Sequence, residues 1–254
     1  MKNYFTIIFA VISLLTVNGA HSQGIYWDKI QKLTSGYQDK NPPFDTKNDF
    51  SWGIRGKTFL VFERDYTSMN SDICVIKFTR DSAFKSNIIN LTGGNTLNHN
   101  PKISWNKRSY SDSILIALAV WERVENGRVN IYGCTFNANT GLWSAPFPID
   151  TSSGIKGHPQ VLFNSAQLFN VVYENNGDII FKQVNASTHT ISNTFNLTAN
   201  DAAECIRPCI LVNSIDSQYT VCYQRKKTNG DYAIYYKKTT PTFNWTGDSV
   251  TTIG

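Results

Sequence analysis

The chain has 254 residues, of which 41% are hydrophobic, 13% aromatic and 17% charged, and its formal net charge is +5. The aromatic share and the low charge exclude a disordered chain and a long heptad-repeat helix, because the first is poor in aromatics and the second is dense in Glu and Lys. The basic residues are scattered along the chain and form no stripe, so we expect no nucleic-acid partner.

The first 22 residues have the pattern of an export signal. Lys2 precedes an uncharged apolar run from Tyr4 to Val17, and Ala20-His21-Ser22 follows as a small-x-small cleavage site. The run is shorter than the roughly 20 residues that span a bilayer. We therefore expect a cleaved signal and no membrane span in the mature chain, with a periplasmic, cell-surface or extracellular location.

A fourfold repeat dominates the remaining chain. Each repeat contains an apolar run that ends in an aromatic residue, then an acid or amide, then a polar residue. These runs are Val61-Phe62-Glu63-Arg64, Val120-Trp121-Glu122-Arg123, Val172-Tyr173-Glu174-Asn175 and Cys222-Tyr223-Gln224-Arg225. Their third positions lie 59, 52 and 50 residues apart. A proline precedes each run, at Pro42, Pro101, Pro159 and Pro208.

The landmarks within a repeat predict its strands. We expect the proline to begin the innermost strand, where its missing N–H does least harm to a sheet, and the aromatic-acid run to form the second strand. The first two repeats are longer, and their extra residues, 48–56 and 106–112, are predicted to extend the loop between these two strands. Another strand-like run and a short polar segment such as Asn90-Leu91-Thr92-Gly93 complete each repeat.

Four short β-rich runs per unit, with a period near 50 residues, predict an all-β fold of the β-propeller class with four-stranded blades. A β-sandwich also has many short strands, but it does not predict the same landmarks in the same order. The predicted blades are residues 37–93, 94–154, 155–200 and 201–254. Residues 25–36 resemble the outer strands of a closing blade, so we expect residues 23–254 to be part of a larger ring, a compact ring of four or five blades being the alternative.

Five cysteines remain after the signal: Cys74, Cys134, Cys205, Cys209 and Cys222. The Cys205-x-x-x-Cys209 spacing has no nearby His and no second Cys pair, so we expect no metal, and nothing else points to a cofactor. If Asn213 pairs with Gln218, then Cys209 faces Cys222 across a hairpin, within reach of a disulfide. Two buried thiols are the alternative.

The repeats resemble two groups of bacterial secreted propellers. A strand, an Asn-Leu-Thr closure and then a proline, as in residues 72–75, 90–93 and 100–101, is similar to the TolB-type repeat. The run Val120-Trp121-Glu122-Arg123, followed by Gly141-Leu142-Trp143-Ser144, resembles repeats of the sialidase-like (BNR-type) superfamily. The turn at residues 137–143 departs from the Asp box of that superfamily, with Asn in place of its Ser and of its Asp and with the Trp one residue early.

The resemblance implies an arginine cluster, because sialidases bind the substrate carboxylate with guanidinium groups. Arg64, Arg123 and Arg225 recur at equivalent positions and are weak binding candidates. A residue that recurs in every blade is more typical of blade architecture than of catalysis, and no motif of another catalytic class occurs.

We therefore expect an exported non-catalytic propeller that binds a protein or glycan at its loop face. The alternatives are a sialidase-like glycoside hydrolase whose catalytic blades are partly missing, and an adhesin fragment without its sorting domain.

Overall fold

The computed structural model describes residues 38–40, 44–47, 57–79, 87–94, 96–105, 116–165, 167–212, 218–239 and 243–249. All of them lie in one compact unit, Gly36–Gly254. The regular structure in these ranges consists of strands β1 to β18, with no helix. The predicted signal and the segment 25–36 lie outside the described residues.

The strands form four antiparallel sheets, one within each of the four predicted repeats. The first contains β1 (Gln38–Lys40), β2 (Phe44–Lys47), β3 (Lys57–Thr67), β4 (Asn70–Thr79) and β5 (Ile89–Asn90). The second contains β6 (Leu97–Trp105), β7 (Ile116–Glu125), β8 (Arg128–Asn137), β9 (Leu142–Trp143) and β10 (Phe147–Asp150). The third contains β11 (Lys156–Ser165), β12 (Leu168–Asn175), β13 (Asp178–Asn185) and β14 (Ile191–Asn196). The fourth contains β15 (Cys205–Val212), β16 (Tyr219–Lys226), β17 (Tyr232–Thr239) and β18 (Trp245–Ser249).

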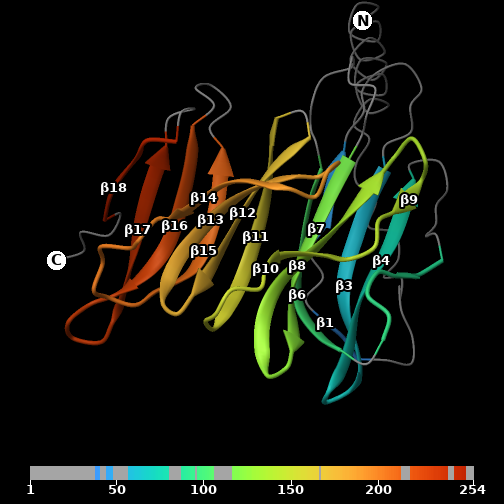
Figure 1. The fold of residues 1–254 in the computed structure, drawn as a ribbon, viewed down its shortest axis with the longest axis horizontal. Coiled ribbons are helices and arrows are strands. Elements are labelled where there is room, and N and C mark those ends of the chain that lie inside the picture. The colour runs from blue at the N-terminus through green and yellow to red at the C-terminus, as the bar shows by residue number, and fades with distance from the viewer. Residues whose placement is uncertain are drawn as a thin grey trace, which may run out of the picture. The chain divides into compact units, whose positions relative to one another are not determined.

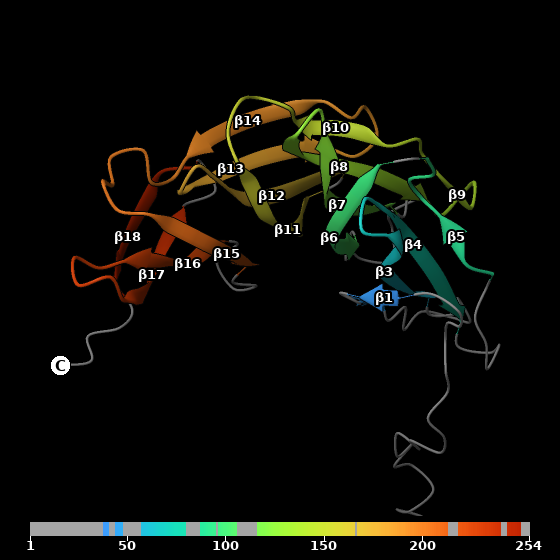
Figure 2. The ribbon, with the colours of Figure 1, turned by 90° about the horizontal axis from the view of Figure 1, so that it is seen from below.

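The four sheets stand side by side (Figure 1) and fan out around the inner strands. Viewed from below, β6, β11 and β15 lie on the concave side of the fan, while β10, β14 and β18 lie toward its convex edge (Figure 2). The inner strand β11 contacts both β6 and β15. This radial order of antiparallel sheets, the first two with five strands and the last two with four, is that of β-propeller blades, as the repeats predict.

The order of strands within each blade agrees with the prediction from the landmarks. The aromatic-acid runs lie on β3, β7, β12 and β16, the second strand of each blade. Their register with the third strand repeats from blade to blade, since Glu63 pairs with Ile73 and Glu122 pairs with Ile131. The extra residues of the long repeats fall between the first and second strands, as expected, because β2 ends at Lys47 and β6 ends at Trp105.

The repeat prolines differ from the prediction in one respect. Pro101, Pro159 and Pro208 do not begin the inner strands β6, β11 and β15 but lie a few residues inside them. Pro42 lies outside the described residues. The ladder with the second strand shifts register at these points, between His99 and Lys102 in the second blade. A proline is tolerated there because a β-bulge leaves its position outside the regular hydrogen-bond ladder.

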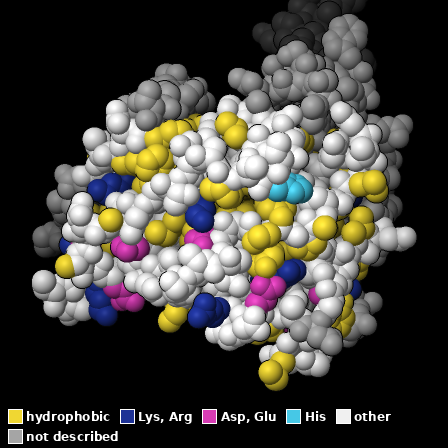
Figure 3. All heavy atoms as spheres, in the orientation of Figure 1, with side chains coloured by type: hydrophobic (Ala, Val, Ile, Leu, Met, Phe, Trp, Pro, Cys, Tyr) yellow, Lys and Arg dark blue, Asp and Glu magenta, His cyan; other side chains and the backbone are white. Residues whose placement is uncertain are grey.

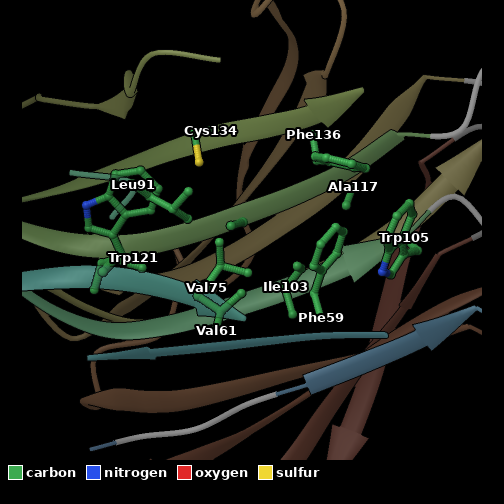
Figure 4. Close-up of a cluster of buried hydrophobic side chains, with 12 residues drawn as sticks. Phe59, Val61, Val75, Leu91, Ile103, Trp105, Ala117, Trp121, Cys134 and Phe136 are labelled. Atoms are coloured by element: carbon green, nitrogen blue, oxygen red, sulfur yellow. The ribbon is translucent and has the colours of Figure 1, made fainter. Parts of the chain in front are cut away.

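The core is formed between neighbouring sheets. Figure 4 shows the seam between the first and second blades, where Phe59 stacks on Trp105 with ring centroids 4.9 Å apart. Val61 and Trp121 are fully buried in the same cluster. Two further clusters fill the next two seams, so the apolar sides of neighbouring sheets cover each other.

The closing segments clamp the outer strands to the blade. Thr198 donates to Asp178 at 2.8 Å and accepts the backbone N–H of Ile179 at 2.9 Å, while Asn196 donates to the same aspartate. The equivalent Asn-Leu-Thr segment of the first blade binds Asp72 and Ile73 in the same way. The recurring closure is therefore explained as a structural element.

On the face of the molecule that Figure 3 shows, Lys and Arg side chains lie beside Asp and Glu and do not form a patch of one sign. The described residues contain no helix that is long and apolar enough to cross a membrane.

Candidate functional site

Three equivalent residues on the inner strands adopt a backbone conformation that is rare outside glycine. Asn100, His158 and Arg207 have φ values of 50°, 50° and 52°, and each directly precedes a repeat proline. Left-handed backbone is unfavourable by about 1–2 kcal/mol for a residue with a Cβ atom. Such a conformation persists only where its surroundings hold it in place, and it often marks a functional position.

The glutamates of the second strands hold this conformation from the preceding blade. Glu122 Oε1 accepts the N–H of His158 at 2.7 Å, and Glu174 Oε2 accepts the N–H of Arg207 at 3.0 Å. Glu63 Oε2 is 3.4 Å from the backbone nitrogen of Asn100. The same tie occurs at all three seams, so the backbone part of the arrangement is blade architecture, as the repeats suggested.

The side chains that these positions present differ from blade to blade, in contrast to their backbone. They are an amide, an imidazole and a guanidinium group at Asn100, His158 and Arg207. His158 and Arg207 are exposed and Asn100 is partly buried. A recurring backbone arrangement that carries three different polar side chains is suited to a binding or catalytic site. The backbone fixes where the side chains lie, and the side chains differ in the groups that they present. We name these residues, together with Glu122 and Glu174, the inner-strand site.

Two carboxylates of the inner-strand site contact the same histidine residue. His158 Nδ1 lies 3.0 Å from Glu174 Oε1, and its backbone nitrogen donates to Glu122. Asn100 Nδ2 also donates to Glu122 Oε1, at 2.9 Å. The side chains of His158 and Glu174 are 45% and 18% exposed. An exposed imidazole held by a carboxylate is an arrangement that can transfer protons.

A second His–Glu pair closes the first seam. His99 Nδ1 is 2.7 Å from Glu63 Oε1, and the side chain of Glu63 is almost fully buried. The hydrogen bond to Glu63 raises the pKa of His99 above its ordinary value, against the opposing effect of burial. This pair joins the first two blades, whereas the imidazole of His158 contacts a carboxylate of its own blade, Glu174.

The three arginines predicted from the sequence each contact aromatic rings of their own blade. Arg64 lies 5.4 Å from the Phe62 ring, Arg123 lies 4.3 Å from the Tyr132 ring and Arg225 lies 5.1 Å from the Tyr235 ring. Nε of Arg123 also donates to Asn98 at 3.1 Å. The described contacts tie each guanidinium group to its own blade, and their role in binding stays a prediction.

Arg225 lines a polar cavity of about 330 Å³ between the third and fourth blades. Its wall includes residues 196–201, Tyr223 and Lys237. Two guanidinium nitrogens of Arg225 bind the Asp201 carboxylate, and this contact lowers the pKa of Asp201 and raises that of Arg225. Arg225 was a predicted binding residue for a ligand carboxylate, and in the structure its guanidinium group is paired with the carboxylate of Asp201.

Cys209 and Cys222 are directly opposed on β15 and β16, as the hairpin register predicts. Both are free thiols in the structure. The register is confirmed, and the disulfide itself stays a prediction. Among the described residues no group of three or more His, Cys, Asp or Glu side chains could hold a metal ion.

Comparisons with known proteins find no matching family model and no matching curated protein. Solved structures do match. An α-L-arabinofuranosidase from Podospora anserina, solved with cellotriose, has a TM-score of 0.46 and 13% identity, over 82% of this chain and 66% of that one. A thermostable family-43 glycoside hydrolase has a TM-score of 0.47 and 13% identity, over 87% and 75% of the two chains. An exo-β-1,3-galactanase from Phanerochaete chrysosporium has a TM-score of 0.48 and 10% identity, over 76% and 47%.

The chain is an all-β protein of the β-propeller class, and the TolB-like and sialidase-like subtypes find no support among these structures. The prediction of a non-catalytic binding module is corrected, since the matching structures are named as glycoside hydrolases. Recurrence along the sequence indicates architecture and does not single out Asn100, His158 and Arg207. The signal for them is a different polar residue directly before each of three repeat prolines.

Proposed function

We propose that this protein is a glycoside hydrolase with the β-propeller fold and that the inner-strand site is its active site. The observation that carries the proposal is the pair of carboxylates, Glu122 and Glu174, in contact with His158 at one end of the inner strands. Glycosidases commonly use two carboxyl groups, one to protonate the leaving oxygen and one to activate water or to attack the sugar.

The geometry favours a particular division of roles. Glu174 is the more exposed carboxyl group and contacts the exposed imidazole of His158, so we assign to it the protonation of the leaving group. Glu122 accepts two hydrogen bonds, from His158 N and Asn100 Nδ2, which hold its carboxyl group in a fixed position, so we assign to it the second role. Arg207, whose N–H binds Glu174, adds a positive group at the same end of the strands.

The test is a hydrolysis screen of the full chain against aryl glycosides and polysaccharides, including arabinofuranosides and β-1,3-galactan. We expect turnover of at least one substrate. For that substrate Glu174→Gln should lower kcat by about 10²–10⁴-fold, the usual contribution of a general acid. The variant is expected to fold, because Gln224 occupies the equivalent position in the fourth blade.

Glu204→Gln is the matched control. Glu204 is an exposed carboxylate that pairs with Lys226 at 3.3 Å, and its loss should leave kcat unchanged. Melting temperatures of both variants separate a lost proton donor from a lost fold. The proposal is wrong if no substrate is hydrolysed by the natural chain, or if Glu174→Gln hydrolyses it as fast as the natural chain does.

Export through the segment 1–22 is also a proposal, supported by its charge and apolar pattern alone. Mass spectrometry of the mature protein from an expressing cell tests it, with an N-terminus near Gln23 as the expected result.

A further inference from the structure

The seam between the second and third blades contains a buried charged cluster. Asp150, at the start of the second closing segment, accepts a hydrogen bond from the Tyr173 hydroxyl and lies 3.3 Å from the Lys182 amine. Lys182 also donates to the carbonyl oxygen of Ile149 at 3.1 Å. The side chains of Asp150 and Lys182 are only 6% and 14% exposed. An amine and a hydroxyl of the third blade thus share one carboxylate of the second blade, as buried polar groups require.

The fourth blade repeats the amine and the hydroxyl of this cluster. The register of the second and third strands places Tyr223 and Lys237 where Tyr173 and Lys182 lie in the third blade. Tyr223 is buried and Lys237 is partly buried. Among the residues that the structure describes, neither the Lys237 amine nor the Tyr223 hydroxyl has a hydrogen-bond or ion-pair partner. Burial raises the pKa of Tyr223 to about 12, so the hydroxyl keeps its proton and can donate it to an acceptor.

The carboxylate of the cluster is not repeated in the third closing segment. Asn196 begins this segment as Asp150 begins the second, and each of the two side chains accepts the backbone N–H two residues later. The Asn196 amide then donates to Asp178 of its own blade. The third closing segment therefore offers no carboxylate at the position from which Asp150 binds the next blade.

The polar cavity of about 330 Å³ lies where the two seams differ, since Tyr223, Lys237 and residues 196–201 line it. Its volume is within the range of about 300–1,000 Å³ that is typical of small-molecule sites. The charged residues of its wall are Lys237, Arg225 and Asp201. Because Arg225 is paired with Asp201, the wall has an excess of one positive charge, that of Lys237.

We propose that this cavity binds a small hydroxylated monocarboxylate of the sugar-acid class, whose carboxylate lies between Lys237 and Tyr223 as Asp150 does between the equivalent groups of the preceding seam. One carboxylate balances the excess charge and accepts hydrogen bonds from both groups. The exposed amides of Asn196 and Asn200 in the wall can bind sugar hydroxyls. No residue of the wall belongs to the inner-strand site, so the inference does not depend on the hydrolase proposal.

The first experiment is a calorimetric titration of the full chain with sodium D-glucuronate. D-glucose is the neutral analogue and sodium sulfate is the inorganic anion. We expect glucuronate to bind with a Kd below about 1 mM and glucose to bind at least about tenfold more weakly, because glucose lacks the charged acceptor. The proposal is overturned if glucuronate does not bind, if it binds no more tightly than glucose, or if sulfate binds as tightly as glucuronate does.

The variant Lys237→Gln assigns the binding to this cavity. It should weaken the binding of glucuronate at least about tenfold, since it removes the charged donor. Lys238→Gln is the matched control, because Lys238 is the adjacent exposed residue and points to the opposite face of the strand. It removes the same charge from the protein and should leave the Kd unchanged. Equal affinities of the two variants overturn the proposal.

A second experiment uses the natural protein and so cannot fail through misfolding. Acylation of lysine amines by an N-hydroxysuccinimide ester is followed by peptide mass spectrometry with and without glucuronate. At about ten times its Kd, glucuronate should slow the modification of Lys237 about tenfold, because the free fraction of the protein falls by that factor. The modification of Lys238 should not change. A rate at Lys237 that is the same with and without glucuronate overturns the proposal.

Discussion

At the scale of single residues, the inner-strand site depends on three backbone conformations that glutamates hold from the preceding blade. His158 illustrates the division of labour, since its N–H serves the architecture through Glu122 while its imidazole contacts Glu174. A residue can therefore belong to a structural repeat by its backbone and to a site by its side chain. Recurrence along the sequence does not separate these two roles.

The Cys209–Cys222 pair gives a residue-scale prediction. The two residues are directly opposed, a geometry in which Cα atoms are about 4.5–5.5 Å apart and a disulfide can form. We expect the exported protein to contain the bridge and to lose about 2–3 kcal/mol of stability in Cys209→Ser, the scale for a loop of this short length.

Peptide mapping under denaturing, non-reducing conditions measures the bridge. Free alkylation of both cysteines in that sample would show that no bridge forms. Cys222→Ser should cause the same loss of stability as Cys209→Ser, because either variant removes the bridge. Cys205→Ser is not a suitable control, because Cys205 is fully buried.

At the scale of elements, the closing segments predict a loss of stability that is local to each blade. Thr198→Val removes the donor to Asp178 and leaves the N–H of Ile179 without its acceptor in a buried place. We expect it to lower the free energy of unfolding by about 1–3 kcal/mol, as for a buried group left unsatisfied. Denaturant unfolding measures the change.

The equivalent Thr92→Val in the first blade should have a comparable effect, and the double variant should be additive, because the two closures share no partner. Thr188→Val, in an exposed turn, is the control and should change stability by less than about 0.5 kcal/mol. A double variant far from the sum would mean that the blades do not respond independently.

At the scale of the whole molecule, the His99–Glu63 pair joins two blades and predicts a pH dependence. The pKa of His99 is raised by Glu63, so the stabilisation is complete below the unfolded-state value of about 6.5 and is lost as the pH rises through the folded-state value. Because the pair is partly exposed, its contribution is on the order of 1 kcal/mol or less.

Unfolding of the natural protein and of His99→Gln should be compared between pH 6 and pH 9. The natural protein should lose more stability across this range than the variant. Glu63, Glu122 and Asp65 are the acidic groups that act on His99 and are present in both proteins. The pKa of His189 is lowered by burial, so this group acts in the opposite direction and cancels in the comparison. Identical slopes would contradict the assignment.

Local patterns were sufficient to predict the blades. The side-chain period of two, the turn residues and the prolines determined the four sheets, the second strand of each, and the register that brings Cys209 opposite Cys222. These features depend on residues that are near one another in the chain, so the sequence carries them directly.

Only the tertiary structure decided which side chains meet. The left-handed conformation of His158 depends on a carboxylate 36 residues earlier, and the grouping of Glu122, His158 and Glu174 depends on how two blades pack. Contacts between residues that are distant in the chain depend on how the blades pack. The pattern of apolar residues in a strand does not show which other segment will pack against it.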